Sequence, residues 1–162
     1  MMIRLAATQD LDDILRVYDQ ARQFMRASGN MLQWVNGYPQ RDLLEADIEK
    51  GHLFVIEEGG AVHGAFAFIL GDDPTYAYIE DGKWPNSKPY GTIHRIGTDG
   101  TIHGAVQMAR DYALQFTDEV RADTHADNKP MQHTLTKNGF IRCGIIYLEN
   151  GDPRIAYQYS KE

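Results

Sequence analysis

The stretch GTIHRIGTDGTIHGAVQMARDYALQF, residues 91–116, combines a strand pattern, a loop that contains glycines and a helix pattern. The run Gly91–Ile96 is typical of a strand, and GTDGTIHG at 97–104 is typical of a turn that opens a helix. We expect that helix to continue to Phe116 on an apolar face that comprises Ala105, Met108, Ala109, Tyr112 and Phe116.

The start of this helix is a predicted anion site. Backbone N–H groups converge there, the macrodipole adds about half a positive charge, and glycines let a ligand approach the backbone closely. The pattern is neither the dinucleotide fingerprint G-x-G-x-x-G nor a P-loop, because no Lys-Ser/Thr pair follows the glycines. A plain tight turn is the alternative interpretation of the loop taken alone.

The first half of the chain predicts a strand, two helices and a hairpin. Ile3–Ala6 alternates like a strand, and a helical spacing of apolar residues follows it from Leu11 to Met25. A loop should occupy residues 31–40, and Arg41–Lys50 should form a short helix. Gly59-Gly60 would turn a hairpin between Leu53–Glu58 and Ala61–Leu70. TYAYIE, residues 75–80, is the only strand expected within residues 71–90.

The second half continues the alternation of strands and helices. After a short strand at Val120–Thr124, Asn128 is a predicted N-cap, Pro130 suits the first helical turn, and Gly139 would end that helix. Ile141–Leu148 and Arg154–Ser160 complete the pattern as strands. This order predicts an α/β or α+β sheet with helices on both faces, in one domain that spans residues 1–162.

Composition excludes several classes of protein. The length of 162 residues suits one core, and the net charge of −7 argues against nucleic acid as a partner. The single cysteine, Cys143, rules out an internal disulfide. The first residues lack the pattern of a secretion signal, and no run of 18 apolar residues occurs. We therefore expect a cytoplasmic protein without a membrane partner.

The residues after the 120–124 strand carry a resemblance to a known family. Asn128-Lys-Pro-Met-Gln-His-Thr-Leu-Thr-Lys-Asn-Gly-Phe140 is similar to the pattern N-x-x-A-x-x-x-Y-x-K-x-G-F of the GNAT superfamily of acyl-CoA-dependent N-acetyltransferases. Asn128, Lys137, Gly139 and Phe140 match in register, and the element order resembles the family from Ile3 to Tyr159. The resemblance implies a mixed, mostly antiparallel sheet of about seven strands flanked by about four helices, with splayed fourth and fifth strands.

The resemblance also implies a site for acetyl-CoA as co-substrate. Its pantetheine arm would pair with the backbone of His94, Arg95 and Ile96, and would contact Asn128 and Met131. Its pyrophosphate would lie on a series of loop amides, namely those of Thr98, Asp99, Gly100, Thr101, Ile102, His103 and Gly104.

The family's phosphate loop, Q/R-x-x-G-x-G/A, fits this chain in two registers. With Gly100 as the first glycine, the apolar face of the helix stays in phase, Gly97 replaces the basic residue and Ile102 replaces the second glycine. With Gly104 as the first glycine, the loop keeps its usual length and the helix is shorter. We prefer the first register because the core should hold the apolar face.

Amine acetylation requires a group that deprotonates the ammonium and one that protonates the leaving thiolate. The family's usual acid is a tyrosine, and Leu135 stands at that position here. His94 is the first candidate base, since an imidazole titrates near neutral pH; a hydrogen-bonded structural role is the alternative. Glu80 is the second candidate, and a solvated carboxylate is its alternative.

Other titratable residues suggest no further chemistry. Asp123 and His125 share a strand face, which could orient an imidazole, but no nearby serine completes a triad. The six histidines lack metal-ligand spacing, so we expect no metal. Cys143 is more typical of a small buried side chain than of a nucleophile.

Aromatic residues in predicted loops are candidates for the acceptor pocket. Trp34, Tyr38, Tyr78 and Trp84 are the predicted substrate-binding residues, and Tyr76 and Tyr90 lie in similar segments. The alternative is that these rings cap the end of the sheet as part of the core. A small aromatic or amphipathic amine would suit such a pocket.

These observations favour acetyl transfer from acetyl-CoA to a primary amine of a small molecule, by direct attack. Two hypotheses remain beside it: a non-catalytic module that binds or senses acyl-CoA, motivated by Leu135, and a protein N-terminal acetyltransferase. The resemblance also implies a homodimer.

Overall fold

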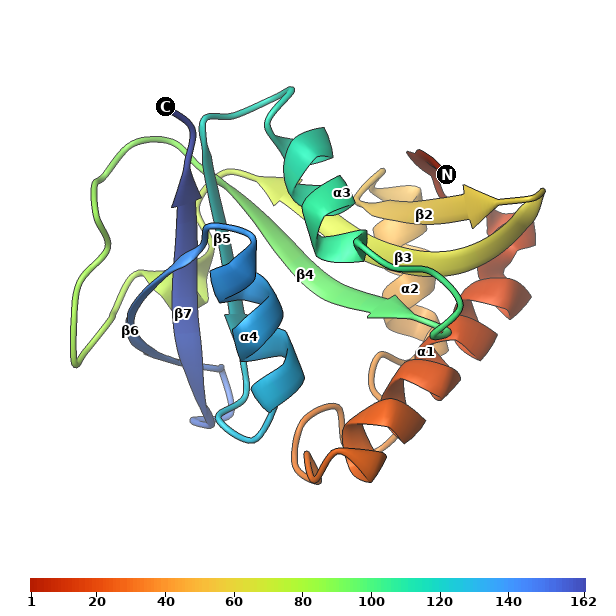
Figure 1. The fold of residues 1–162 in the computed structure, drawn as a ribbon, viewed down its shortest axis with the longest axis horizontal. Coiled ribbons are helices and arrows are strands. Elements are labelled where there is room, and N and C mark those ends of the chain that lie inside the picture. Colours follow the sequence, from red (N-terminus) through yellow and green to blue (C-terminus); the bar gives the residue numbers. More distant parts are fainter.

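A single seven-stranded mixed sheet forms the centre of the computed structural model, which describes residues 1–162 (Figure 1). The strands are β1 Met2–Leu5, β2 Leu53–Glu58, β3 Ala61–Leu70, β4 Gly91–Thr98, β5 Glu119–Thr124, β6 Ile141–Tyr147 and β7 Pro153–Ser160. The helices are α1 Leu11–Ala27, α2 Arg41–Glu49, α3 Ala105–Ala113 and α4 Lys129–Lys137. The predicted element order and fold class are confirmed, and the Gly59-Gly60 hairpin joins β2 to β3 as expected.

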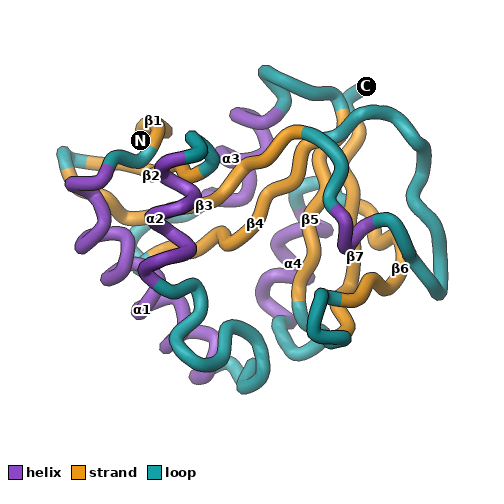
Figure 2. The backbone as a smooth tube through the Cα atoms, turned by 180° about the vertical axis from the view of Figure 1, so that it is seen from behind, coloured by secondary structure: helices purple, strands orange, loops and turns teal.

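The sheet has the order β1-β2-β3-β4-β5-β7-β6 and carries helices on both faces. Helices α1 and α2 cover the face that is seen in front in Figure 2, and α3 and α4 cover the other (Figure 1). Alternate residues of β2 separate the two cores: Leu53 and Val55 pack towards α1, whereas Phe54 and Ile56 pack towards α3. None of the helices is both long and apolar enough to cross a membrane.

The fourth and fifth strands separate soon after they meet. β4 and β5 pair in parallel only at Gly91↔Val120 and Thr92↔Arg121, whereas every other strand pair is antiparallel. Beyond Thr92 the two strands diverge, as Figure 1 shows. The edge of β4 that faces β5 is therefore left without a strand partner from Ile93 onward.

A bulge in β4 accompanies this separation. Ala67 pairs with His94 and Ala65 with Gly97, so that Arg95 and Ile96 together oppose Phe66 alone. Arg95 has a φ of 53°, in the left-handed region that a residue with a Cβ atom seldom adopts. Bulges of this kind bend a strand and increase its twist, which turns the second half of β4 away from β5.

The expected strand at 75–80 is wrong. Pro74–Tyr76 forms a short 3-10 turn, whose first free amide, that of Thr75, donates to the Asp73 carboxylate at 2.9 Å. Only Glu80 makes a bridge, to Ile145 of β6. Proline has no N–H to contribute to a ladder, and Asp73 offers the backbone a cap instead, so the alternating pattern does not form a strand.

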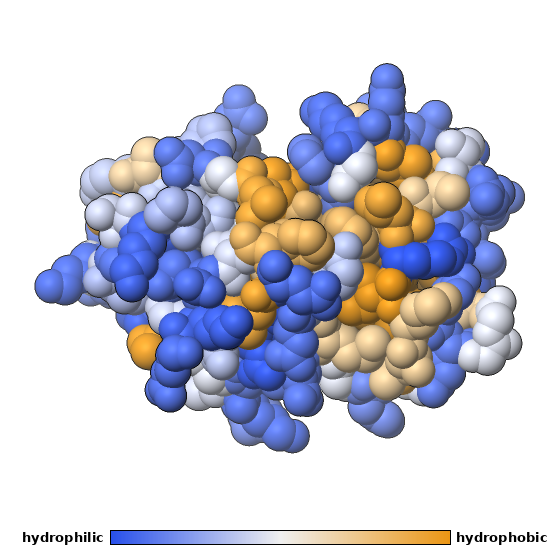
Figure 3. All heavy atoms as spheres, turned by 90° about the horizontal axis from the view of Figure 1, so that it is seen from above, coloured by the Kyte–Doolittle hydropathy of each residue, from blue (hydrophilic) through white to orange (hydrophobic).

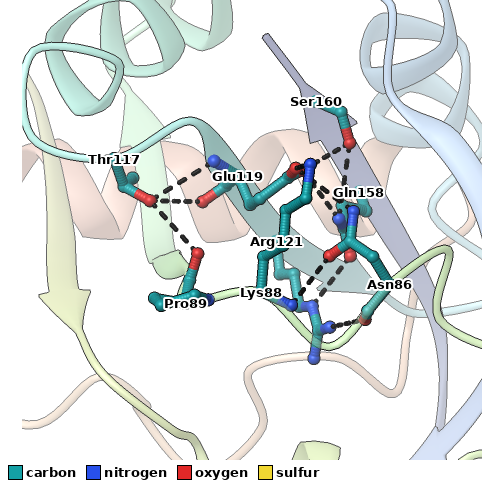
Figure 4. A network of polar contacts seen from close by, with 8 residues as sticks. All are labelled: Asn86, Lys88, Pro89, Thr117, Glu119, Arg121, Gln158 and Ser160. Atoms are coloured by element: carbon teal, nitrogen blue, oxygen red, sulfur yellow. Dashed lines mark hydrogen bonds and ion pairs between the residues drawn. The ribbon is translucent and has the colours of Figure 1, made fainter.

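A network of polar contacts holds the loop of residues 84–90 against the end of the sheet (Figure 4). Arg121 of β5 donates to Gln158 of β7 at 2.9 Å and to the Asn86 carbonyl at 3.2 Å. Its guanidinium lies 3.9 Å from the ring centres of both Trp84 and Tyr90. The network continues from Gln158 to the Glu119 carboxylate, so that the buried polar groups satisfy one another.

Apolar side chains are not confined to the two cores. Figure 3 shows apolar residues gathered near the middle of one face, between hydrophilic neighbours. Across the whole surface, Leu70, Phe116 and Leu32 are each more than half exposed. Some apolar exposure of this kind is normal for a folded protein.

We expect Arg121→Met to lower the free energy of unfolding by about 3 kcal/mol, because it removes two cation–π contacts and leaves the Gln158 oxygen without its donor. Urea denaturation would measure the change. Arg142→Met is the matched control, since the Arg142 side chain is 48% exposed, and its effect should stay within about 0.5 kcal/mol. Equal effects of the two substitutions would contradict a structural role for the Arg121 network.

Candidate functional site

A cavity of about 660 Å³ lies where β4 and β5 diverge. Successive side chains of a strand point to opposite faces, so Ala122 and Asp123 of β5 contribute to different parts of its wall. The part on the α3 and α4 side is apolar and is formed by Ile93, Val106, Ala122, Met131, Leu135 and Phe140. The opposite part is polar and includes Asp73, Thr75, His94, Asp123 and Arg154. The cavity thus joins an apolar half to a polar half through the gap in the sheet.

His94 and Asp73 form a hydrogen-bonded pair in the polar half. Nε2 of His94 lies 2.8 Å from Oδ2 of Asp73. The other carboxylate oxygen of Asp73, Oδ1, accepts from the amide and the hydroxyl of Thr75. Burial would raise the pKa of Asp73, but the hydrogen bonds from His94 and Thr75 outweigh it and hold the pKa at about 2. An ionised carboxylate can only accept, so Nε2 carries the proton of this hydrogen bond, and Nδ1 has no partner in the chain.

Asp123 and Tyr76 form a second pair beside the first. The Tyr76 hydroxyl donates to Asp123 at 2.6 Å, and the Tyr76 and His94 rings are 6.3 Å apart. Burial raises the pKa of Asp123, against the opposing influence of His94 and of the Tyr76 hydrogen bond. His125, which shares the strand pattern with Asp123, is held elsewhere, because its Nδ1 accepts from the Asp127 amide at 2.9 Å.

The bulge residue Arg95 is held from three sides. Its guanidinium donates to Asp47 of α2 at 2.8 Å and to the Tyr38 hydroxyl at 3.3 Å. Its carbonyl accepts from the Tyr18 hydroxyl of α1 at 2.6 Å. Burial lowers the pKa of Arg95, but Tyr38 and Asp47 raise this pKa by more than burial lowers it, so the guanidinium stays charged. These contacts keep β4 in its bent conformation along the cavity.

The loop after α1 closes one end of the cavity. Arg26 donates to the carbonyls of Asn30, Gln33 and Trp34 at 2.8–2.9 Å and so fixes the path of the loop. The Gln33 side chain then accepts from the Asn128 amide at 3.1 Å, across 95 residues of sequence. Asn128 also caps α4 by accepting from the Met131 amide at 3.1 Å. One side chain therefore begins a helix and anchors the loop above the cavity.

The helix start lies later than the preferred register of the phosphate loop implies. α3 begins at Ala105, and its N-cap is Gly104, with a φ of 81° that favours glycine. This observation favours Gly104 as the first glycine and argues against Gly100. The short helix still buries Val106, Ala109 and Ala113, so the apolar face does not require the longer form.

Several loop amides have hydrogen-bond partners within the chain. The Asp99 amide donates to the His63 carbonyl at 3.0 Å, and those of Gly100 and Thr101 donate to the side chains of Thr98 and Asp99. The expectation that these three amides bind a pyrophosphate stays a prediction, and such binding would have to replace the contacts that they make within the chain. The amides of Ala105, Val106 and Gln107, at the start of α3, have no partner in the helix.

The cavity gathers some of the predicted residues and leaves others outside. His94, Arg95, Ile96, Asn128 and Met131 line it, as do Trp34 and Tyr38. The remaining predicted residues do not: the carboxylate of Glu80 accepts from Tyr147, Tyr78 is 63% exposed, and the Trp84 indole donates to the Tyr76 carbonyl. Tyr76 and Tyr90 belong to a small core cluster, as the alternative interpretation of the aromatic residues held. No group of three or more His, Cys, Asp or Glu side chains is arranged to hold a metal ion.

The sequence alone did not identify Asp73, Thr124 or Arg154 as cavity residues. Asp73 precedes Pro74, a pattern that predicts a turn and gives no hint of a partner on β4. Arg154 begins the strand expected at RIAYQYS, and a charged residue at the end of a strand is common. The Thr124 hydroxyl is buried in the cavity wall without any hydrogen-bond partner, which only the folded chain reveals.

Comparison with solved structures assigns the fold to a family. An acetyltransferase of the GNAT family from Streptococcus agalactiae 2603 is 34% identical, with a TM-score of 0.87 over 99% of this chain and 95% of the other. The chain belongs to the GNAT family of acetyltransferases. GNAT acetyltransferases from Bacillus cereus ATCC 10987 and Listeria monocytogenes 4b F2365 share the fold at 22% identity, with TM-scores of 0.66 and 0.69 over 99% and 98% of this chain and 97% and 94% of theirs. Neither protein-family models nor curated proteins give a match.

This GNAT chain is an acetyltransferase that departs from the family pattern at Leu135. The side chain is 3% exposed and belongs to the core between the sheet and helices α3 and α4. A leucine there cannot supply a proton, so the titratable groups of the site are those of the polar half of the cavity.

Asp73→Asn should change how stability depends on pH. The native pKa of about 2 lies below the value of about 3.9 for an unfolded aspartate, so the charge contributes above about pH 4 and its contribution disappears as the pH falls towards 2. We expect the substitution to cost about 2 kcal/mol of unfolding free energy at pH 7 and almost nothing at pH 2. Urea denaturation across this pH range measures the difference in unfolding free energy. Asp72→Asn is the control, because the neighbouring Asp72 is exposed.

Asn128→Ala should destabilise the fold, because it removes the cap of α4 and the donor to Gln33. A cap is worth about 1 kcal/mol, and the loss of the second contact should add to it. Asn128→Ser keeps a capping oxygen and should recover the cap's share of the loss. If the serine variant were as unstable as the alanine variant in urea denaturation, capping would not be the role of Asn128.

Proposed function

We propose that this acetyltransferase transfers the acetyl group of acetyl-CoA to a primary amine of a small molecule, by direct attack of the amine on the thioester. The observation that carries the proposal is the His94–Asp73 pair, which lies in the wall of a cavity between two diverging strands. An oriented imidazole with a free nitrogen is the group that deprotonation of an ammonium requires.

The apolar half of the cavity and the end of the sheet fit acetyl-CoA. The edge of β4 has unpaired backbone groups beyond Thr92 that can bond the amides of a pantetheine arm. The buried Thr124 hydroxyl needs a hydrogen-bond partner that the chain does not supply. The start of α3 offers free amides and the positive end of a helix dipole to a pyrophosphate. His94, Arg95, Ile96, Asn128 and Met131 would hold the arm, together with the amides that follow Gly104.

The thioester, when bound, supplies an acyl carbon that an amine can attack and a thiolate that can leave. His94 prepares the amine: Nδ1 accepts a proton from the ammonium, while Asp73 holds the Nε2–H and stabilises the imidazolium that results. The contact with Asp73 thus holds the imidazole of His94 at the place where the ammonium has to lose its proton. The carbon–nitrogen bond replaces the carbon–sulfur bond, and backbone N–H groups on the open edge of β4 can polarise the carbonyl oxygen.

Acetyl-CoA titration is the first test. We expect saturating acetyl-CoA to raise the melting temperature, since a ligand that binds only the native state adds about 2.7 kcal/mol at 100 times its Kd. A panel of small amines should then release free thiol in the presence of the protein. Binding without any release would favour an acyl-CoA sensor, and the absence of both would overturn the proposal.

His94→Gln should lower kcat by roughly 10²–10⁴-fold and leave the affinity for acetyl-CoA intact, because only proton transfer is lost. The substitution should also remove the acidic limb of the pH–rate profile, which reports the need for an unprotonated imidazole. His133→Gln is the control, since His133 is exposed on α4 and does not line the cavity. A His94 variant with most of the original rate and an unchanged profile would exclude His94 as the base.

A further inference from the structure

Arg154 is a buried cation in the cavity wall without a carboxylate partner. The residue is 8% exposed, and the one hydrogen bond that its side chain makes within the chain runs from a guanidinium N–H to the Pro153 carbonyl at 2.8 Å. No carboxylate oxygen lies within 4.0 Å of it. Arg95, by contrast, is paired with Asp47 at 2.8 Å. Arg154 lines the cavity, and its remaining guanidinium N–H groups have no partner within the chain.

A buried guanidinium without an anion is unfavourable. Burial lowers the pKa of Arg154, and Asp123 and Asp152 offset this effect only from beyond contact distance. A guanidinium presents several N–H groups in a plane that matches a carboxylate, and such pairs are among the stronger hydrogen bonds in proteins. The unsatisfied donors thus point to an anionic group of a ligand, with a carboxylate as the best geometric match.

The other charges of the polar half suit the opposite end of such a ligand. Asp73 is ionised and holds His94, and Asp123 lies beside them. An ammonium is attracted to this group of carboxylates, where His94 can accept its proton. One cavity therefore offers a cation for a carboxylate and a base for an amine.

We propose that the acceptor is an amino carboxylate, such as an amino acid, whose carboxylate binds Arg154 while its amine faces His94. The inference rests on the proposed N-acetyltransferase function and adds the chemical class of its substrate. During transfer the ammonium gives one proton to His94 and the nitrogen bonds to the acetyl carbon. The carbon–sulfur bond then breaks, and the second proton of the nitrogen passes to the departing sulfur, which leaves as the thiol of coenzyme A. The carboxylate takes no part in these steps and serves only to position the amine.

The test compares each acceptor with a neutral analogue. The common L-amino acids and β-alanine are assayed by thiol release beside their carboxamides, which keep the amine and lack the charge. We expect at least one amino acid to exceed its amide in kcat/KM by roughly 10–100-fold, as a charged hydrogen-bonded pair allows. Arg154→Met should remove this preference through a higher KM for the amino acid, with little change for the amide.

Arg154→Lys and Arg142→Met complete the design. The lysine variant keeps the positive charge and should restore part of the preference for the amino acid. It therefore still tests the inference if the methionine variant does not fold. Arg142 is half exposed on β6 outside the cavity, and its variant should behave like the original chain. Equal use of amino acids and amides, or an equal loss for both in Arg154→Met, would overturn the inference while the acetyltransferase proposal stands.

The Arg154 site can also be tested by binding, in case the proposed function fails. If no amine in the panel releases thiol, calorimetric titration with N-acetyl amino acids and their amides still measures the Arg154 site. Tighter binding of the acids that is lost in Arg154→Met would support a carboxylate site in a non-catalytic protein. Equal binding, or none of either series, would overturn the Arg154 inference as well.

Discussion

The bend of β4 at Arg95 is the constraint on which the rest of the site depends. A residue with a Cβ atom in the left-handed region is held there only when its surroundings outweigh the backbone strain. Here Tyr18 of α1, Asp47 of α2 and Tyr38 of the intervening loop all contact Arg95. The helices on one face of the sheet thus hold open the gap between β4 and β5, and the cavity exists because that gap is not closed by strand pairing.

The gap connects two chemical environments that a continuous sheet would have kept apart. On the α3 and α4 side, Leu135 and its neighbours form an apolar wall that continues the main core. On the other side, two partly buried pairs, His94 with Asp73 and Tyr76 with Asp123, share the wall with Arg154, which has no anionic partner. Pairing keeps the cost of burying these polar groups low, whereas the donors of Arg154 and the Thr124 hydroxyl remain unsatisfied within the chain. Unsatisfied buried groups that face a cavity are typical of a ligand site.

Part of the candidate site could be predicted from the sequence, and the rest could not for identifiable reasons. His94 was found because a titratable residue in an apolar strand next to a loop and a helix is conspicuous. Asp73 escaped notice because its partner lies 21 residues away and the Asp-Pro pair indicates only a turn. Tyr78 and Trp84 were predicted to bind substrate because aromatic residues in loops suggest recognition, and Glu80 was predicted as a second base because a carboxylate can accept a proton. None of the three lines the cavity, since a loop pattern does not record which way a side chain points.

The sequence by itself determined the local structure of this protein: the order of its strands and helices, the Gly59-Gly60 hairpin and the Asn128 cap. These features depend on residues within a few positions of one another, so periodicity, glycines and capping side chains suffice to predict them. Only the tertiary structure decided where β4 bends, which amides remain free at the start of α3, and that Arg154 is buried without a partner. Those properties arise from contacts between residues tens of positions apart, such as Arg95 with Asp47, and no local pattern records which buried charges will meet.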